Sequence, residues 1–255
     1  MQPVQGLHHI TAIASNPQAN VDFYHTILGQ RLVKRTVNFD DPGTYHFYYG
    51  DAVGTPGTIL TFFPWRHMKR GTKGNGEATA VSYNISTASV SYWQDRLEAH
   101  DISLGERQTR FGQDVLAFPD PDGMMVELIV NDDRATIQNW DDGSVPAQHA
   151  LRGFHSVTAW VGKTQPTADL LINQLGYALV GQEGARSRFR GAANDVGLYI
   201  DLLERPSLPA GRMGAGTIHH IAFRTVDDEE QLEYLQKLRP QGYNVSPVMD
   251  RQYFR

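Results

Sequence analysis

The sequence contains no cysteine among its 255 residues. This absence excludes disulfides, thiolate metal sites and cysteine nucleophiles together. Any metal ion would have to be bound by His, Asp or Glu side chains, which favours harder or borderline metals.

The sequence also lacks the features of nucleic-acid-binding, secreted and membrane proteins. The formal net charge is −5, and basic residues are scattered apart from a short stretch between His67 and Lys73, so a basic face for nucleic acid is missing. No apolar run approaches membrane-spanning length, and the N-terminus lacks the order of a signal peptide. We therefore expect a cytoplasmic protein with no nucleic-acid partner and no membrane partner.

A unit of one strand, a capped helix, a glycine and further strands recurs four times along the chain. In the first copy, a strand over 7–14 leads to Asn16 and Pro17, which are a side-chain cap and a proline at the first helical position. The second copy starts near Ala78, and its turn at 120–123 predicts a hairpin between its last two strands. The third and fourth copies start near His155 and Thr217.

These repeats predict an α+β fold of four βαβββ modules paired into two domains, with cupped antiparallel or mixed sheets and helices outside. Weak periodicity after Asp132 places the boundary there, so we expect an N-terminal domain over 1–140 and a C-terminal domain over 150–255. The fourth module lacks its closing hairpin by comparison with the others. The cupped interior of each sheet is large enough in principle to hold a ligand.

A histidine doublet occurs at equivalent positions of the first and fourth copies, as His8-His9 and His219-His220. Because successive side chains of a strand point to opposite faces, we expect only His9 and His220 to point into the cup. If the two copies pair, both rings enter one cavity. Two imidazoles and one carboxylate form the facial arrangement that binds Fe(II) and leaves positions open for substrate and oxygen. The residues expected to share these faces are Leu7, Thr11 and Ile13 with His9, and Ile218 and Ala222 with His220.

A lone strand histidine is more often a hydrogen-bonded structural residue than a ligand, and recurrence at equivalent positions is what favours the metal interpretation. His155 of the third copy and Glu127 of the second could form a competing site, but with one histidine in that pair we favour a structural role. The remaining histidines that we assign to the surface or to packing are His25, His46 and His100.

The doublets and several further segments resemble the ring-cleaving dioxygenase branch of the vicinal oxygen chelate superfamily, which contains hydroquinone dioxygenases and many proteins of the glyoxalase family. The resemblance extends through essentially the whole chain. It implies four βαβββ modules in two domains and a non-haem Fe(II) ion, or sometimes Mn(II), held by two histidines and a glutamate. The segments that carry it are 7–11, 30–37, 54–58, 152–156 and 218–220.

The two implied histidine ligands correspond to His9 and His220, whereas the implied glutamate has no counterpart. It would follow an aromatic-rich segment and a Pro-Gly-Gly turn, and this sequence ends at Arg255 before that region. We expect the sequence to be truncated, because a half-finished module would leave a sheet edge exposed. By the same resemblance, His8, Thr11 and His219 line the pocket or support the ligands, and Arg251 steadies a developing anionic oxygen.

The resemblance implies a small aromatic substrate, such as a hydroquinone or catechol, and O2 as the reaction partners; a homo-oligomer is left open. Two rival functions also stay open. One is a glyoxalase-type lyase or isomerase on the same fold, since fold does not determine chemistry. The other is a non-catalytic protein that binds or confers resistance to an aromatic compound, in a cup lined by Tyr45, Phe47, Tyr49, Phe62, Phe63 and Trp65.

Overall fold

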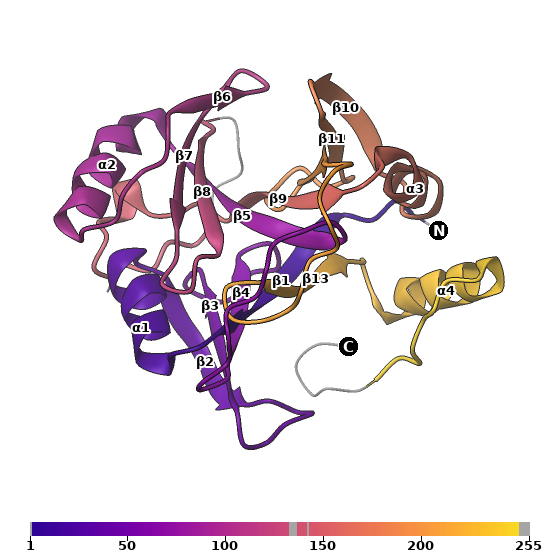
Figure 1. The fold of residues 1–255 in the computed structure, drawn as a ribbon, viewed down its shortest axis with the longest axis horizontal. Coiled ribbons are helices and arrows are strands. Elements are labelled where there is room, and N and C mark those ends of the chain that lie inside the picture. The colour runs from indigo at the N-terminus through magenta and orange to yellow at the C-terminus, as the bar shows by residue number, and fades with distance from the viewer. Residues whose placement is uncertain (1, 133–136, 142, 250–255) are drawn as a thin grey trace.

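The computed structural model describes residues 2–132, 137–141 and 143–249. It contains two mixed sheets, with the short helices outside them (Figure 1). This arrangement confirms the predicted α+β class with two curled mixed sheets. No helix in the described ranges is long and apolar enough to cross a membrane.

The first copy forms β1 (Gly6–Ala14), a helix made of α1 (Pro17–Val21) and η1 (Asp22–Ile27), and the strands β2 (Arg31–Val37), β3 (Tyr45–Gly50) and β4 (Ile59–Pro64). Asn16 caps this helix as predicted, because its side chain accepts hydrogen bonds from the backbone N–H groups of Gln18 and Ala19 at 2.9 and 3.2 Å. The strand predicted over 7–14 agrees with β1 to within one residue.

The second copy contains β5 (Glu77–Ile85), η2 (Thr87–Ser89), α2 (Val90–Ala99), β6 (Gln108–Arg110), β7 (Gln113–Pro119) and β8 (Met125–Val130). Its predicted hairpin is confirmed, since β7 and β8 pair in antiparallel fashion and Gly123 closes the turn with φ 88°. Inside that turn, Asp120 accepts the backbone N–H groups of Asp122 and Met124.

The third copy, which follows η3 (Ala147–His149), contains β9 (Phe154–Val161), α3 (Thr164–Asp169), η4 (Leu170–Gln174), β10 (Ala178–Glu183), β11 (Arg186–Arg190) and β12 (Tyr199–Glu204). The described part of the fourth copy contains β13 (Ile218–Arg224), α4 (Asp228–Leu238) and η5 (Arg239–Gln241). Asp227 caps α4, because its side chain accepts the Glu230 N–H at 2.9 Å.

Each complete copy places its strands in the same order, because its first strand pairs in parallel with its fourth. The copies then join through antiparallel pairing of their first strands, β1 with β13 and β5 with β9. The results are a five-stranded sheet, β13-β1-β4-β3-β2, and an eight-stranded sheet, β10-β11-β12-β9-β5-β8-β7-β6. The first and fourth copies therefore pair, which is the condition under which both inner rings were expected to enter one cavity.

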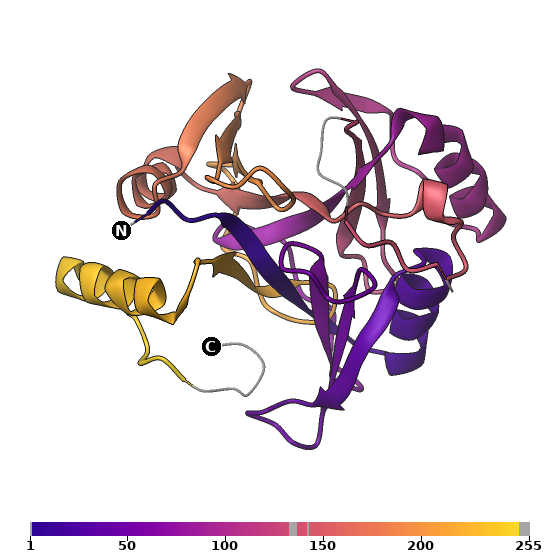
Figure 2. The same ribbon diagram turned by 180° about the vertical axis from the view of Figure 1, so that it is seen from behind.

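Both sheets combine strands from the two halves of the chain, so neither half forms a sheet by itself. Figure 1 and Figure 2 show α1 and α2 on one side of the molecule, with α3 and α4 on the other. The division into domains over 1–140 and 150–255 stays a prediction. What matters for function is that the β1–β13 pairing brings the two histidine doublets onto neighbouring strands.

Candidate functional site: two histidine doublets on paired bulges

Both doublets lie at irregularities of the β1–β13 ladder. On β1, the register shifts between Leu7 and His9, so that His8 is an extra residue in that strand. On β13, the register shifts opposite Thr11 and Ala12, and His219 is the extra residue there. A bulge of this kind leaves one residue unpaired and re-aims the side chains beside it. Each of the two doublets therefore lies at a β-bulge.

The bulges overturn part of the predicted face pattern. Leu7 and Ile218 belong to the main hydrophobic core rather than to the faces of His9 and His220, because the extra residue in each strand shifts the alternation by one position. The prediction that only one histidine of each doublet faces the site is also wrong: both rings of each doublet are in contact on that side. Thr11 and Ala222 keep the predicted alternation relative to His9 and His220.

The four imidazoles form a continuous row across the two strands. His9 Nε2 lies 3.3 Å from His220 Nε2 at the centre. At the two ends, His8 Nδ1 lies 3.0 Å from His9 Nδ1, and His219 Nδ1 lies 2.8 Å from His220 Nδ1. The inner rings thus turn their Nε2 atoms toward each other and their Nδ1 atoms toward the outer rings.

Neutral imidazole is favoured at three of the four rings in this row. Burial holds the pKa of His9 well below its ordinary value, and the neighbouring His220, His8 and His46 lower it further. Burial also lowers the pKa of His8, with the Arg224 guanidinium as the second cause. The pKa of His219 is lowered by burial, which outweighs the opposite effect of Asp40. Neutral rings keep a lone pair for a metal ion or a hydrogen-bond donor.

Further side chains from β1, β3 and β4 lie on the same face as the two inner histidines. We call this set the histidine face: His9, Thr11, His46, Tyr48, Thr61, Phe63 and His220. The Tyr48 hydroxyl lies 2.9 Å from His46 Nδ1, and His46 Nε2 lies 2.9 Å from Thr61 Oγ1. Thr61 Oγ1 in turn lies 2.8 Å from Thr11 Oγ1. This hydrogen-bonded chain links β3 to β1 two residues away from His9. Phe63 is an apolar wall beside it, with ring centroids 4.4 Å from His46 and 5.5 Å from His219.

Sequence reasoning missed His46, which it assigned to the surface or to packing. Its proximity follows from the strand order β1-β4-β3, which a single sequence does not reveal. His25 does pack, against Trp140 and the Gln30 carbonyl, and His100 is exposed. Arg251 lies outside the described residues. Of the aromatics expected to line a cup, Phe47, Tyr49 and Phe62 instead belong to the hydrophobic core.

The histidine face supplies two of the three ligands that are expected for the metal ion. Two nitrogens bound to one ion at about 2.1 Å lie roughly 3.0 to 3.4 Å apart at octahedral to tetrahedral angles, and the 3.3 Å between the inner Nε2 atoms falls in that range. Over residues 2–132, 137–141 and 143–249, no group of three or more His, Asp or Glu side chains is arranged to hold a metal. The described residues therefore supply an imidazole pair without a carboxylate.

The other predicted pair is engaged elsewhere. Glu127 accepts hydrogen bonds from Arg110 at 2.8 Å and from Ser82 at 2.7 Å. His155 Nε2 lies 3.1 Å from the Gln113 amide oxygen, and its Nδ1 lies 3.0 Å from the Ser156 hydroxyl. These partners favour the structural role that was expected for both residues.

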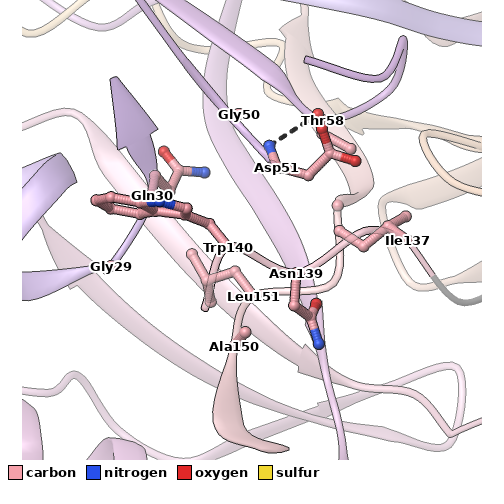
Figure 3. A pocket seen from close by; sticks show the side chains of 11 residues that line it. Gly29, Gln30, Gly50, Asp51, Thr58, Ile137, Asn139, Trp140, Ala150 and Leu151 are labelled. Atoms are coloured by element: carbon pink, nitrogen blue, oxygen red, sulfur yellow. Dashed lines mark hydrogen bonds between the residues drawn. The ribbon is translucent and has the colours of Figure 1, made fainter. Parts of the chain in front are cut away.

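A separate small cavity near the Asp51 turn is shown in Figure 3, with the Trp140 ring beside Gln30 and a hydrogen bond from the Asp51 N–H to Thr58. Its volume of about 20 Å³ is enough for a single water molecule. An aromatic substrate does not fit there.

Comparison with known proteins agrees with the fold. The sequence pattern of the Glyoxalase/Bleomycin resistance protein/Dioxygenase superfamily matches residues 6–128. A Bacillus subtilis protein named as a ring-cleaving dioxygenase, MhqO, is 45% identical over 98% of this chain and 78% of its own length. The chain belongs to this superfamily.

Two further relatives support the same branch. A chlorohydroquinone/hydroquinone 1,2-dioxygenase of Sphingobium indicum is 37% identical over 98% of this chain and 79% of its own length. The crystal structure of a protein described as a dioxygenase from Bacillus subtilis superimposes with a TM-score of 0.94 at 43% identity, covering 99% of this chain and 80% of the other. The predicted membership of the ring-cleaving dioxygenase branch is confirmed.

Glyoxalase I from Zea mays shares the fold alone. Its TM-score is 0.68 at 13% identity, over 92% of this chain and 80% of that one. The same fold therefore occurs in a protein with a different name, and the fold by itself does not determine the function.

Proposed function

We propose that this protein is a non-haem Fe(II) dioxygenase, able to accept Mn(II), that opens the ring of a hydroquinone or a catechol-like compound. The observation that carries the proposal is the 3.3 Å approach of His9 Nε2 to His220 Nε2 from two distant copies of the repeat. The names of the relatives support the substrate class, since one of them is a chlorohydroquinone/hydroquinone 1,2-dioxygenase.

In this proposal, His9 and His220 hold the metal through Nε2. Each then carries its proton on Nδ1 and donates it to the Nδ1 lone pair of His8 or His219, 3.0 and 2.8 Å away. Partners of this kind fix the tautomer and the orientation of a ligating ring. A bound ferrous ion would supply the redox chemistry that joins oxygen to the aromatic ring.

The rest of the histidine face orients the substrate and handles its proton. Phe63 offers an apolar surface next to the histidine row for a flat ring, and Trp65 extends it with a ring centroid 5.3 Å from that of Phe63. A phenol that binds as a phenolate must lose a proton, and His46 is the group in the Thr11-Thr61-His46-Tyr48 chain that can take one up.

Oxygen consumption tests this proposal. The protein is purified without oxygen, loaded with Fe(II) or Mn(II), and mixed with hydroquinone, methyl- and chloro-substituted hydroquinones, and catechol in an oxygen electrode. We expect one O2 to be consumed for each ring opened, with loss of the aromatic absorbance. His9→Ala should remove the uptake, and His100→Ala, at an exposed histidine away from the row, should retain it. Iron-loaded protein that consumes no oxygen with any of these compounds would contradict the proposal.

A further inference from the structure

The eight-stranded sheet carries a cavity that is separate from the histidine face. Its volume is about 540 Å³, ample for a small organic molecule. Six of the residues that line it carry the argument: Phe111, Gln113, His155, Arg188, Arg190 and Tyr199. They come from the second and third copies, so this second cup is the counterpart of the histidine face in the other sheet.

Buried arginines around the cup outnumber the carboxylates that they contact. Arg188 forms a bidentate ion pair with Asp201, with hydrogen bonds of 2.8 and 2.9 Å, and Arg186 contacts the same carboxylate at 3.1 Å. Arg110 pairs with Glu127 at 2.8 Å. The exposed fraction of these five side chains is 13% or less. Three positive charges thus meet two negative ones, which leaves one positive charge in surroundings that hydrate it poorly.

Arg190 adds a second positive charge. Its guanidinium donates to the carbonyls of Gly191 and Ala193 and to the side-chain oxygen of Asn194, all neutral acceptors. Asp195 also lines the cavity, but its carboxylate is bound by both terminal nitrogens of Arg224, at 2.8 and 2.6 Å. Glu183, whose carboxylate accepts the Phe111 N–H at one side of the cup, adds one negative charge. Among the described residues that line or support the cup, five arginines then meet four carboxylates, and the one remaining positive charge favours an anion.

His155 contributes no charge of its own near neutral pH. Burial lowers its pKa to about 3, and the nearby Arg188 is the next cause. Its Nε2 faces the Gln113 amide oxygen, which also accepts a hydrogen bond from Arg188 at 2.9 Å. A neutral ring held in this way leaves the arginines as the charged groups of the cup.

The walls of the cup suit a flat group. The Arg188 guanidinium carbon lies 4.2 Å from the ring centroid of Phe111 and 5.2 Å from that of Tyr199, so aromatic rings flank the cation. The His155 ring lies beside Tyr199 with a centroid distance of 4.9 Å. A compact inorganic ion would leave most of the volume and these ring surfaces unused.

Phe111 also closes one side of the cup. It lies in the turn between β6 and β7 with φ 48°, a left-handed conformation that costs energy for a bulky residue. Its N–H is held by both carboxylate oxygens of Glu183 at 2.8 and 2.9 Å, and its ring packs over Gly181. Since β6 and β10 are the two edges of the sheet, this one residue bridges them; Figure 1 shows these edges facing each other.

We propose that the second cup is a binding site for a small planar organic anion, an aromatic carboxylate, held by Arg188 and Arg190 and by the rings around them. The proposal does not depend on dioxygenase activity. It gives the second and third copies a ligand of their own, distinct from the metal expected at the histidine face.

Calorimetric titration of the whole chain with benzoate tests the site. Val180 lines the cavity from β10 and is half exposed, whereas its neighbour Leu179 is equally exposed and is not among the lining residues. Val180→Trp should weaken benzoate binding at least tenfold by filling the cup, and Leu179→Trp should leave the affinity unchanged. Equal affinity of both variants, or absence of benzoate binding by the unaltered chain, would overturn the proposal.

Further titrations separate the contribution of the ligand's charge from that of its aromatic ring. Benzyl alcohol, which keeps the ring without the charge, should bind at least tenfold more weakly than benzoate, and Arg190→Gln should weaken benzoate by a similar factor. Inorganic phosphate should also bind more weakly than benzoate; phosphate binding as tight as that of benzoate would overturn the aromatic component. His220→Ala should leave benzoate affinity unchanged, and a loss there would place the anion at the histidine face instead.

Discussion

His9 and His220 are 211 positions apart in the sequence, yet their Nε2 atoms lie 3.3 Å from each other. Two matching bulges produce this approach, one in β1 at His8 and one in β13 at His219. Each bulge adds one residue to its strand, so that two consecutive histidines face the same side instead of opposite sides. One ring of each doublet therefore lies at the centre of the row, and the other contacts it through Nδ1.

The outer histidines should matter through their acceptor nitrogen. We expect His8→Leu to weaken binding of Fe(II) or Mn(II) by about 10- to 100-fold, because the Nδ1–H of His9 would lose its partner. His8→Gln, which restores an oxygen acceptor, should lose much less. The dissociation constants of the metal, measured by competition with a chelator under anaerobic conditions, provide the comparison.

The corresponding pair at His219 gives an independent check, since His219 Nδ1 lies 2.8 Å from His220 Nδ1. His219→Leu and His219→Gln should show the same order. If the leucine and glutamine variants bind metal equally well at both positions, the outer rings do not act through that hydrogen bond.

Thr61 should stabilise the fold through the chain of hydrogen bonds on the histidine face. Its hydroxyl is completely buried and lies within hydrogen-bonding distance of both Thr11 and His46. Thr61→Val keeps the shape but leaves these partners unsatisfied, so we expect a loss of about 1–3 kcal/mol in the free energy of unfolding. Thr61→Ser should retain most of that free energy. Urea unfolding curves of the three proteins measure the difference, and a valine variant as stable as the unaltered chain would argue against the hydrogen-bonded chain.

Asp120 should give the folded state a distinctive pH dependence. Burial raises the pKa of this carboxyl to about 6, although Met124, Tyr24 and Asp122 donate hydrogen bonds to it. The folded state then holds the proton more tightly than the unfolded chain does. Its contribution to the free energy of unfolding is present below pH 4 and is lost between about pH 4 and 6, by an amount on the order of 3 kcal/mol.

Asp120→Asn isolates this contribution, because it removes the titration while the amide can still accept the same backbone N–H groups. Urea unfolding at a series of pH values should show a shallower fall in stability between pH 4 and 6 for the variant than for the unaltered chain. Parallel curves for the two proteins would show that the carboxyl does not titrate in that window.

Much of the architecture could be predicted because it depends on local chemistry. The Asn16 cap, the Asp120-Gly123 turn and the repeated strand-helix-glycine pattern are each encoded within a few residues. The recurrence of the doublet also placed His9 and His220 at equivalent positions, so that both rings were expected in one cavity if the first and fourth copies pair, as β1 and β13 do.

The details that decide the chemistry of the site depend on contacts between distant strands. Strict alternation along β1 places Leu7 on the same face as His9, and only the pairing with β13 reveals the extra residue that separates them. His46 joins the site because β4 lies between β1 and β3 and carries Thr61 toward both. Neither a bulge nor a strand order has a signature in the sequence of a single strand.

The stoichiometry of metal binding tests the central claim most directly. Protein purified without oxygen is incubated with Fe(II), freed of excess metal and analysed by elemental analysis, together with His9→Ala, His220→Ala and the control His100→Ala. We predict one iron per chain for the unaltered protein and the control, and none for either inner-histidine variant. Retention of iron by a variant that lacks His9 or His220 would contradict the assignment of these two rings as partners in one metal site.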